Sequence, residues 1–135
     1  MGYFLAPAGT LQDPWDIDDW MAELPNNPAM LFPDNKRGRA MQRGDRVIRY
    51  AAGSPRVFGS GRFFASQEVV SRQTEPHEDS RWPWRREVRL RLAQPFLSQA
   101  PTLEDIGVDP KSVRHQPYIN LTPEQGQRAE ELLLR

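Results

Sequence analysis

The sequence has no cysteine, only two histidines and no long hydrophobic run. Without cysteine the chain can form no disulfide, no thiolate metal site and no cysteine nucleophile, and this composition fits a reducing cytoplasm. No apolar segment approaches the roughly 20 residues that a membrane-spanning helix needs. The first five residues lack the basic start and the apolar stretch of a signal peptide. We therefore expect a cytoplasmic protein with no membrane partner.

Residues with typical catalytic or metal-binding spacing are also lacking. His77 and His115 lie far apart, and a solvated loop explains the polar segment around His77 better than a divalent-cation site does. No serine-hydrolase, zinc-protease or phosphate-loop motif is present. Glu87 has no convincing acidic partner, and Arg89 stands where a metal-dependent nuclease would usually have lysine. We therefore expect no catalytic residue, no metal and no cofactor.

The net charge is zero, but the charges are unevenly distributed along the chain. Residues 1–35 carry six acidic and no basic residues, whereas residues 36–91 carry fourteen basic and six acidic ones. All but one of these fourteen are arginines, whose planar fork suits phosphates and base edges. The basic block could bind nucleic acid, or the acidic segment could neutralise it within the fold. Charge alone leaves both alternatives open.

A chain of 135 residues has room for one hydrophobic core, so we expect a single domain over residues 1–135. The apolar patterns and turn residues predict strands over 3–6, 29–32, 46–52, 56–66, 82–92 and 118–121. They predict helices over 14–24 and from 123 to about 134, and a turn or short helix over 102–106. Strands that cluster without helical crossovers favour an α+β fold with a mostly antiparallel, strongly curved sheet or small barrel.

The segment from Trp82 to Leu92 combines aromatic residues with an alternating strand. Val88, Leu90 and Leu92 alternate with charged residues, which predicts a half-buried strand with an arginine-lined outer face. At its start, Trp82 and Trp84 lie beside Arg81, Arg85 and Arg86. Such a surface could stack a base while holding phosphates. Both tryptophans could equally be core residues, and Phe32 and Tyr50 fit the core better than a binding pocket.

Five segments, in this order, resemble EVE domains and the related YTH domains over nearly the whole chain. They are the opening strand 3–6, the basic segment from Asn35 with the strand 44–50, the segment 57–63, the strand that follows Trp82, and the segment 118–126. The resemblance implies a PUA-like fold, a small curved β-barrel with flanking helices. It also implies an aromatic cleft that takes up one modified base, typically methylated cytosine or adenine, from DNA or RNA.

Site residues follow from this resemblance together with the charge pattern. The expected base pocket consists of Phe32, Asn35, Tyr50, Ser60, Gly61, Trp82, Trp84 and Tyr118. The expected phosphate-binding residues are Lys36, Arg37, Arg39, Arg43, Arg62, Arg81 and Arg85. Where many relatives carry a tryptophan, this chain has Leu31-Phe32-Pro33, so Phe32, Tyr50 or Trp84 would have to complete the cage.

The sequence therefore predicts a non-catalytic, monomeric reader that binds a modified base, methylated in the simplest case, flipped out of DNA or RNA. In many relatives catalysis comes from a fused or partner nuclease domain, for which this chain leaves no room. Two alternatives stay open: a nuclease or RNA-processing enzyme, and a module that binds a small metabolite or a protein. The modified base, the type of nucleic acid and its strandedness are not specified by the sequence.

Overall fold

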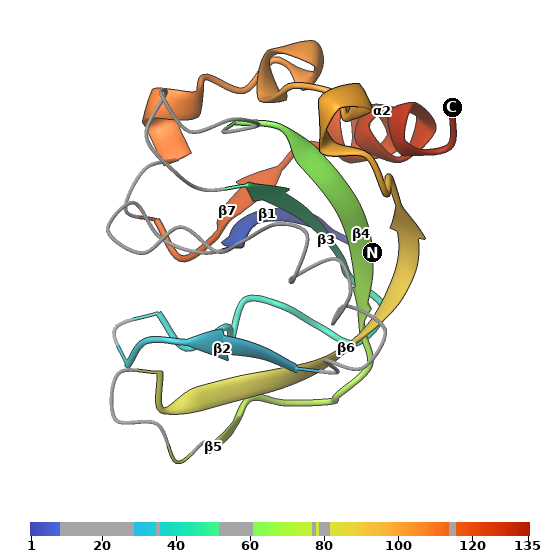
Figure 1. Cartoon of the computed structure of the whole chain (residues 1–135). Helices are drawn as coiled ribbons and strands as arrows, with labels where there is room; N and C mark the ends of the chain where they lie inside the picture. The colour runs from blue at the N-terminus through green and yellow to red at the C-terminus, as the bar shows by residue number, and fades with distance from the viewer. Residues whose placement is uncertain (9–28, 35, 52–60, 77, 79–81, 114–115) are drawn as a thin grey trace.

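A computed structural model describes residues 1–8, 29–34, 36–51, 61–76, 78, 82–113 and 116–135 (Figure 1). The strands are β1 (Tyr3–Ala8), β2 (Ala29–Phe32), β3 (Arg46–Ala51), β4 (Phe63–Val69), β5 (Glu75–Pro76), β6 (Trp84–Ala93) and β7 (Ile119–Leu121). Three 3-10 helices, η2 (Leu97–Gln99), η3 (Leu103–Ile106) and η4 (Pro110–Val113), precede the α-helix α2 (Pro123–Leu133). The helix predicted over 14–24 lies outside the described residues.

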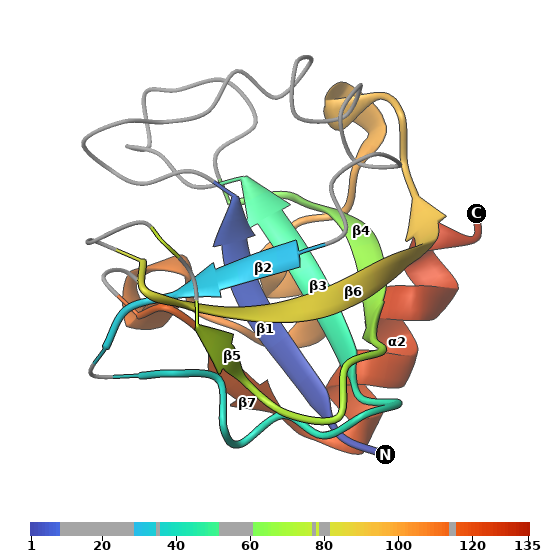
Figure 2. The same ribbon diagram turned by 90° about the horizontal axis from the view of Figure 1, so that it is seen from below.

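The described strands form one mixed sheet in the order β2-β6-β4-β3-β1-β7, with β5 paired to β6 off this path. β1 and β3 run parallel, and the other pairs are antiparallel, as the sequence predicts for most of the sheet. The end strands β2 and β7 do not pair with each other, so the sheet is a curled half-barrel rather than a closed barrel (Figures 1 and 2).

The curl of the sheet comes from the long strand β6, which belongs to both halves. Its first residues pair with β2 and β5, and its second half pairs with β4. The register shifts between Ser66 and Gln67 on β4, and an irregularity of this kind bends a strand and increases its twist. Figure 1 shows β2 and β5 folded away from the layer that contains β1, β3 and β4.

Hydrophobic residues fill both faces of the sheet, because alternate side chains of each strand point to opposite sides. Tyr3 and Leu5 of β1 pack with Ile48, the short helices and α2. Phe4 of β1 packs with Val47 and other residues inside the half-barrel. The interior of the half-barrel is therefore a second core, on the side of the sheet away from α2.

Most of the predicted elements are confirmed within one or two residues. Ala29–Phe32 is a strand, and Leu103–Ile106 is a short helix. β1 continues two residues past its predicted end, to Ala8. It can include Pro7, which has no N–H to donate, because the pairing with β7 stops at Leu5. The capping box at the start of α2 is also confirmed, because the Thr122 side chain accepts a hydrogen bond from the Gln125 N–H and the Gln125 side chain accepts one from the Thr122 N–H.

Residues 56–60 of the strand predicted over 56–66 lie outside the described residues, and the strand extends further along the chain than predicted. Gly61 has a φ of 79°, and the strand β4 begins only at Phe63 and continues to Val69. The polar residues Ser66, Gln67 and Glu68 concealed this strand in the sequence. They are accommodated because each is engaged by a side chain elsewhere: Glu130, Arg49 and Arg89, respectively. The predicted hairpin pairing of β3 with β4 is confirmed.

Gly126 of α2 lies directly against the Tyr3 ring, which gives a test of this contact. A Cβ at Gly126 would lie 2.0 Å from Tyr3 Cγ. Gly126→Ala should therefore lower the free energy of unfolding by about 1–3 kcal/mol, although alanine raises helix propensity by about 1 kcal/mol. Urea denaturation should show this loss, with the exposed Glu131→Ala on the same helix as the control. A stabilised Gly126→Ala would contradict the packing of α2 against β1.

Candidate nucleic-acid interface

Three aromatic rings fill one end of the half-barrel interior, and we call Phe4, Phe32 and Tyr118 the aromatic cluster. Tyr118 packs edge-on against Phe4 and Phe32, with ring centroids 5.7 and 5.6 Å apart. Phe32 is 0% exposed and Tyr118 is 5% exposed. The sequence predicted both as walls of a base pocket, but in this structure they are core rings whose faces contact the protein itself.

Two basic side chains from the loop after β2 lie on aromatic rings beside this cluster. Lys36 Nζ lies 4.3 Å from the centroid of the Tyr118 ring and donates a hydrogen bond to the Tyr118 carbonyl. Arg37 Cζ lies 4.3 Å from the centroid of the Trp84 ring. Trp84 begins β6 opposite Phe32 of β2, so strand pairing brings these rings to one end of the half-barrel.

Asp34 bridges Arg37 and Trp84. Its carboxylate accepts a hydrogen bond from Trp84 Nε1 at 2.9 Å and forms an ion pair with Arg37 at 2.7 Å. The bond from Trp84 is the main cause that lowers the pKa of Asp34, and the Arg37 charge lowers it further. The side chain is 69% exposed, so the pair adds little stability and an external anion can replace it. We call Asp34, Lys36, Arg37, Trp84 and Tyr118 the cation–aromatic site.

Partial burial also shifts the other titrating groups of this site. Desolvation lowers the pKa of the Lys36 ammonium group. Burial raises the pKa of the Tyr118 hydroxyl, and backbone hydrogen bonds at Gly38 and Ala40 oppose this shift. The Tyr118 ring is therefore neutral at physiological pH, and its face can attract the cation above it.

Arg86 of β6 holds the loop of the cation–aromatic site in place. Its guanidinium is buried and donates to the carbonyls of Met41 and Ser71 at 2.8 Å each, to Gly38 O at 3.4 Å and to Ser71 Oγ at 3.1 Å. The sequence placed Arg86 on a surface beside the tryptophans. That interpretation is wrong, because Arg86 shares the inward face of β6 with Val88.

Tyr50 does not share a pocket with Phe32. The Tyr50 ring packs with Ile48 and Val113 on the α2 side of the sheet, and its hydroxyl donates to Val113 O at 3.3 Å. Phe32 lies on the opposite side, in the half-barrel interior. Burial raises the pKa of Tyr50 to about 12. The prediction that Tyr50 completes the aromatic cage is therefore wrong for this structure.

Two of the predicted phosphate-binding arginines are engaged by other groups of the protein. Arg62 donates to the carbonyl of Ala100. Arg85 forms ion pairs with Glu87 at 2.9 Å and with Glu75 at 3.7 Å. A phosphate would have to compete with these partners, as it would with Asp34 at Arg37. Arg37 differs from Arg62 and Arg85 in lying on the Trp84 ring.

The remaining predicted residues are exposed or half-buried, or lie outside the described residues. Arg39 and Arg43 are exposed, Trp82 is half-buried just before β6, and Gly61 forms a turn before β4, beside Pro110. Asn35, Ser60 and Arg81 lie outside the described residues.

Arg49 is a buried charged residue that the sequence did not single out. It donates to Gln67 Oε1 at 2.9 Å and to the Pro7 carbonyl at 2.8 Å. Burial lowers its pKa to about 10, so it stays protonated at neutral pH. Asp34 was missed as well, although its position just after β2 and before two basic residues was a usable signal.

The described part of the chain shows neither a metal cluster nor a membrane-spanning helix. No group of three or more His, Cys, Asp or Glu residues within it could hold a metal ion. None of its helices is long and apolar enough to cross a bilayer.

Comparison with solved structures gives the same fold in several proteins. A protein from Agrobacterium tumefaciens matches with a TM-score of 0.65 and 17% identity, over 98% of this chain and 93% of that chain. Human THYN1, solved with DNA containing 5-methylcytosine, matches with a TM-score of 0.64 and 12% identity, over 100% and 99%. The YTH domain of Zygosaccharomyces rouxii MRB1, solved with N6-methyladenosine RNA, matches with a TM-score of 0.61 and 11% identity, over 98% and 86%.

These matches show a PUA-like α+β fold, a curled mixed sheet forming a half-barrel with a C-terminal helix. The resemblance to EVE and YTH domains that the sequence predicts is thus confirmed at the level of the fold. No family model and no curated protein matches the chain.

Arg86→Met tests whether the buried guanidinium holds the loop after β2. Methionine keeps the volume of the side chain but leaves the carbonyls of Met41 and Ser71 without their donor. The free energy of unfolding in urea should fall by about 2–5 kcal/mol. The neighbouring Arg85→Met should change it by less than about 1 kcal/mol, because Arg85 forms half-exposed ion pairs. Equal effects of the two variants would contradict this role of Arg86.

Proposed function

We propose that this chain is a non-catalytic nucleic-acid reader that binds a modified base, methylated in the simplest case. The observation that carries the proposal is the cation–aromatic site, where Lys36 and Arg37 lie on the rings of Tyr118 and Trp84. The fold supports it, because THYN1 and the MRB1 YTH domain share this fold and were solved with methylated DNA and RNA. Both were solved in complex with nucleic acid, which favours binding over catalysis for this chain.

The half-buried Trp84 is the ring that a base could reach in this site. Phe32 and Tyr118 are sealed in the core, whereas the Trp84 indole is covered by the Arg37 guanidinium. An exposed cation–π contact is worth about 0.5–1 kcal/mol, and a base stacked on an aromatic ring about 1–3 kcal/mol. A base can therefore replace Arg37 on the indole, and Trp82 two residues earlier can provide a second ring.

A nucleic-acid ligand also gives the displaced arginine a new partner. Arg37 is bound to the exposed carboxylate of Asp34, which a phosphate next to the flipped base can replace. Arginine suits this exchange because its fork binds a phosphate through two hydrogen bonds. Phosphate contacts then fix the strand, and the contacts of the base decide whether its modification is recognised.

Trp84→Leu tests the stacking of the base. Loss of the ring should weaken binding of an oligonucleotide with 5-methylcytosine or N6-methyladenine by about 1–3 kcal/mol and reduce the preference over the unmodified oligonucleotide. Trp84→Phe should retain most of this preference. Fluorescence anisotropy measures the affinities, and thermal unfolding checks that both variants fold. Trp82→Ala, tested in parallel, should also reduce the preference. If folded Trp84→Leu and Trp82→Ala both keep the full preference, the base does not bind here.

Arg37→Ala tests the phosphate contact of the site. Binding to a single-stranded oligonucleotide should weaken, and the slope of the logarithm of affinity against the logarithm of salt concentration should fall by about 0.7 for each lost phosphate contact. Arg128→Ala is the matched control, because this exposed arginine lies on α2 in an ion pair with Glu131. Equal slopes for wild type and Arg37→Ala would exclude Arg37 as a phosphate ligand.

A further inference from the structure

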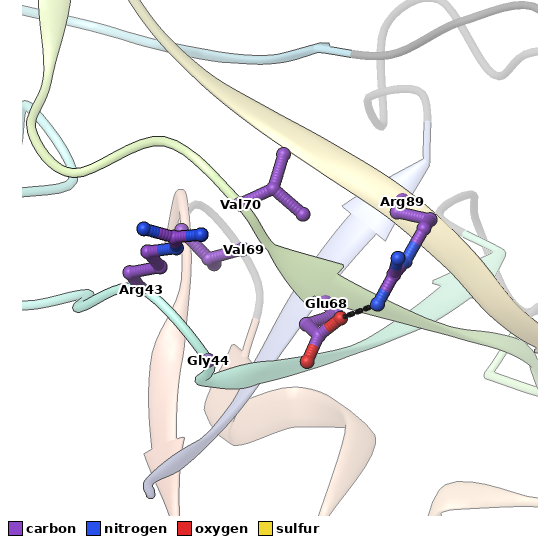
Figure 3. A pocket seen from close by; sticks show the side chains of 6 residues that line it. All are labelled: Arg43, Gly44, Glu68, Val69, Val70 and Arg89. Carbon is purple, nitrogen blue, oxygen red and sulfur yellow. Dashed lines mark hydrogen bonds and ion pairs between the residues drawn. The ribbon is translucent and has the colours of Figure 1, made fainter.

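A pocket of about 390 Å³ lies on another part of the surface, between the turn before β3 and the strands β4 and β6 (Figure 3). We call it the outer pocket. It is lined by Arg43, Gly44, Glu68, Val69, Val70 and Arg89. None of these residues belongs to the cation–aromatic site, so the outer pocket is a separate candidate for ligand binding.

Arginines surround the outer pocket from two directions. Arg43 reaches it from the turn before β3, and Arg89 reaches it from β6, where its side chain is 65% exposed. Arg91, two residues further along β6, lies 3.7 Å from the same Glu68 carboxylate that Arg89 binds. Two arginines of β6 thus lie at the Glu68 carboxylate, and Arg43 lines the same pocket. Within the described residues, no hydrogen bond or ion pair engages the Arg43 side chain.

Glu68 occupies the position that an anionic ligand would take beside Arg89. Its side chain is 19% exposed, and the hydrogen bond from Arg89 is the main cause that lowers its pKa. The carboxylate is therefore ionised at neutral pH and neutralises only part of the local charge. Figure 3 shows the bond from Arg89 to Glu68 on one side of the pocket and Arg43 on the other.

The chemistry of the lining favours a phosphate over a base. No aromatic ring lines the outer pocket, so a base would have nothing to stack on. A Cβ built on Gly44 would meet nothing within 4 Å, which leaves open space next to Arg43. Two arginine forks across an open space suit the tetrahedral oxygens of a phosphate diester.

We propose that the outer pocket binds a backbone phosphate of the same nucleic-acid strand whose modified base lies at Trp84. This inference rests on the proposed function and adds a second contact point to it. The loop between β2 and β3 links the two places, since it carries Lys36 and Arg37 at one end and Arg43 at the other, with Arg39 between them. A nucleic-acid strand bound along this loop would pass Arg39 and Arg43 before it reaches Arg89.

The experiment compares a trinucleotide with a longer single-stranded oligonucleotide, each with one central modified base. Arg43→Ala and Arg89→Ala should weaken binding of the longer oligonucleotide by about 3- to 10-fold and lower its salt slope by about 0.7 each. Arg89 lies five residues along β6 from Trp84, roughly 17 Å at the rise of a β-strand. A trinucleotide with its central base at Trp84 is too short to span this separation, so neither variant should change its affinity. Arg128→Ala again serves as the control.

Glu68→Gln should have the opposite effect. The amide keeps the shape of the side chain, removes a negative charge from the pocket and releases Arg89, so the longer oligonucleotide should bind more tightly. A merely structural role of Glu68 would instead lower stability in urea without any gain in affinity.

The outcomes separate this inference from the proposed function. If wild type binds both oligonucleotides, and Arg43→Ala and Arg89→Ala bind the longer one as wild type does, the outer pocket is not a phosphate site and the reader function stands. If wild type binds neither oligonucleotide with any modification, the proposed function fails and this inference fails with it. A Glu68→Gln variant that folds but binds no more tightly also overturns the inference.

Discussion

The hydrogen bonds of the Arg86 guanidinium hold together the part of the structure on which the candidate site depends. Burying a charge is costly unless hydrogen bonds satisfy it, and here backbone carbonyls of two separate segments do so. These carbonyls belong to Met41 and Ser71, which lie on the loop after β2 and the turn after β4. Through them, a single side chain of β6 connects the loop that carries Lys36 and Arg37 to the sheet.

The sequence predicted the fold well where local chemistry decides the structure. Thr122 and Gln125 define the start of α2 by their own hydrogen bonds, and the alternation along β6 reflects two different environments of its faces. It predicted β4 poorly, because the interior of this strand is polar. Gln67 is buried there with its side-chain oxygen accepting a hydrogen bond from Arg49, which lies diagonally across from it on β3, and this contact depends on the register of β3 with β4. Such contacts are set by the tertiary structure and leave no local pattern.

The candidate site also depends on tertiary contacts that the local sequence does not reveal. An aromatic residue in the sequence can be a core ring or a binding ring, and burial decides which, as it does for Phe32 and Tyr50. The basic block pointed to one region of the chain, but it did not show which arginines are engaged by acids of the same fold. Among the described residues Arg85 is engaged in this way and Arg43 is not, because Arg85 lies on a strand with Glu75 and Glu87 within reach.

The place of β1 between β3 and β7 has a consequence for how the chain folds during synthesis. Residue 3 pairs with residue 121 on one side and with residue 46 on the other, and the Tyr3 hydroxyl reaches Glu130 across 127 residues of sequence. One edge of β1 therefore stays without its partner strand until residues 119–121 have left the ribosome. Until then the partly folded chain presents an open strand edge, a form prone to mispairing with other chains. Native contacts this distant in sequence also make for slow folding.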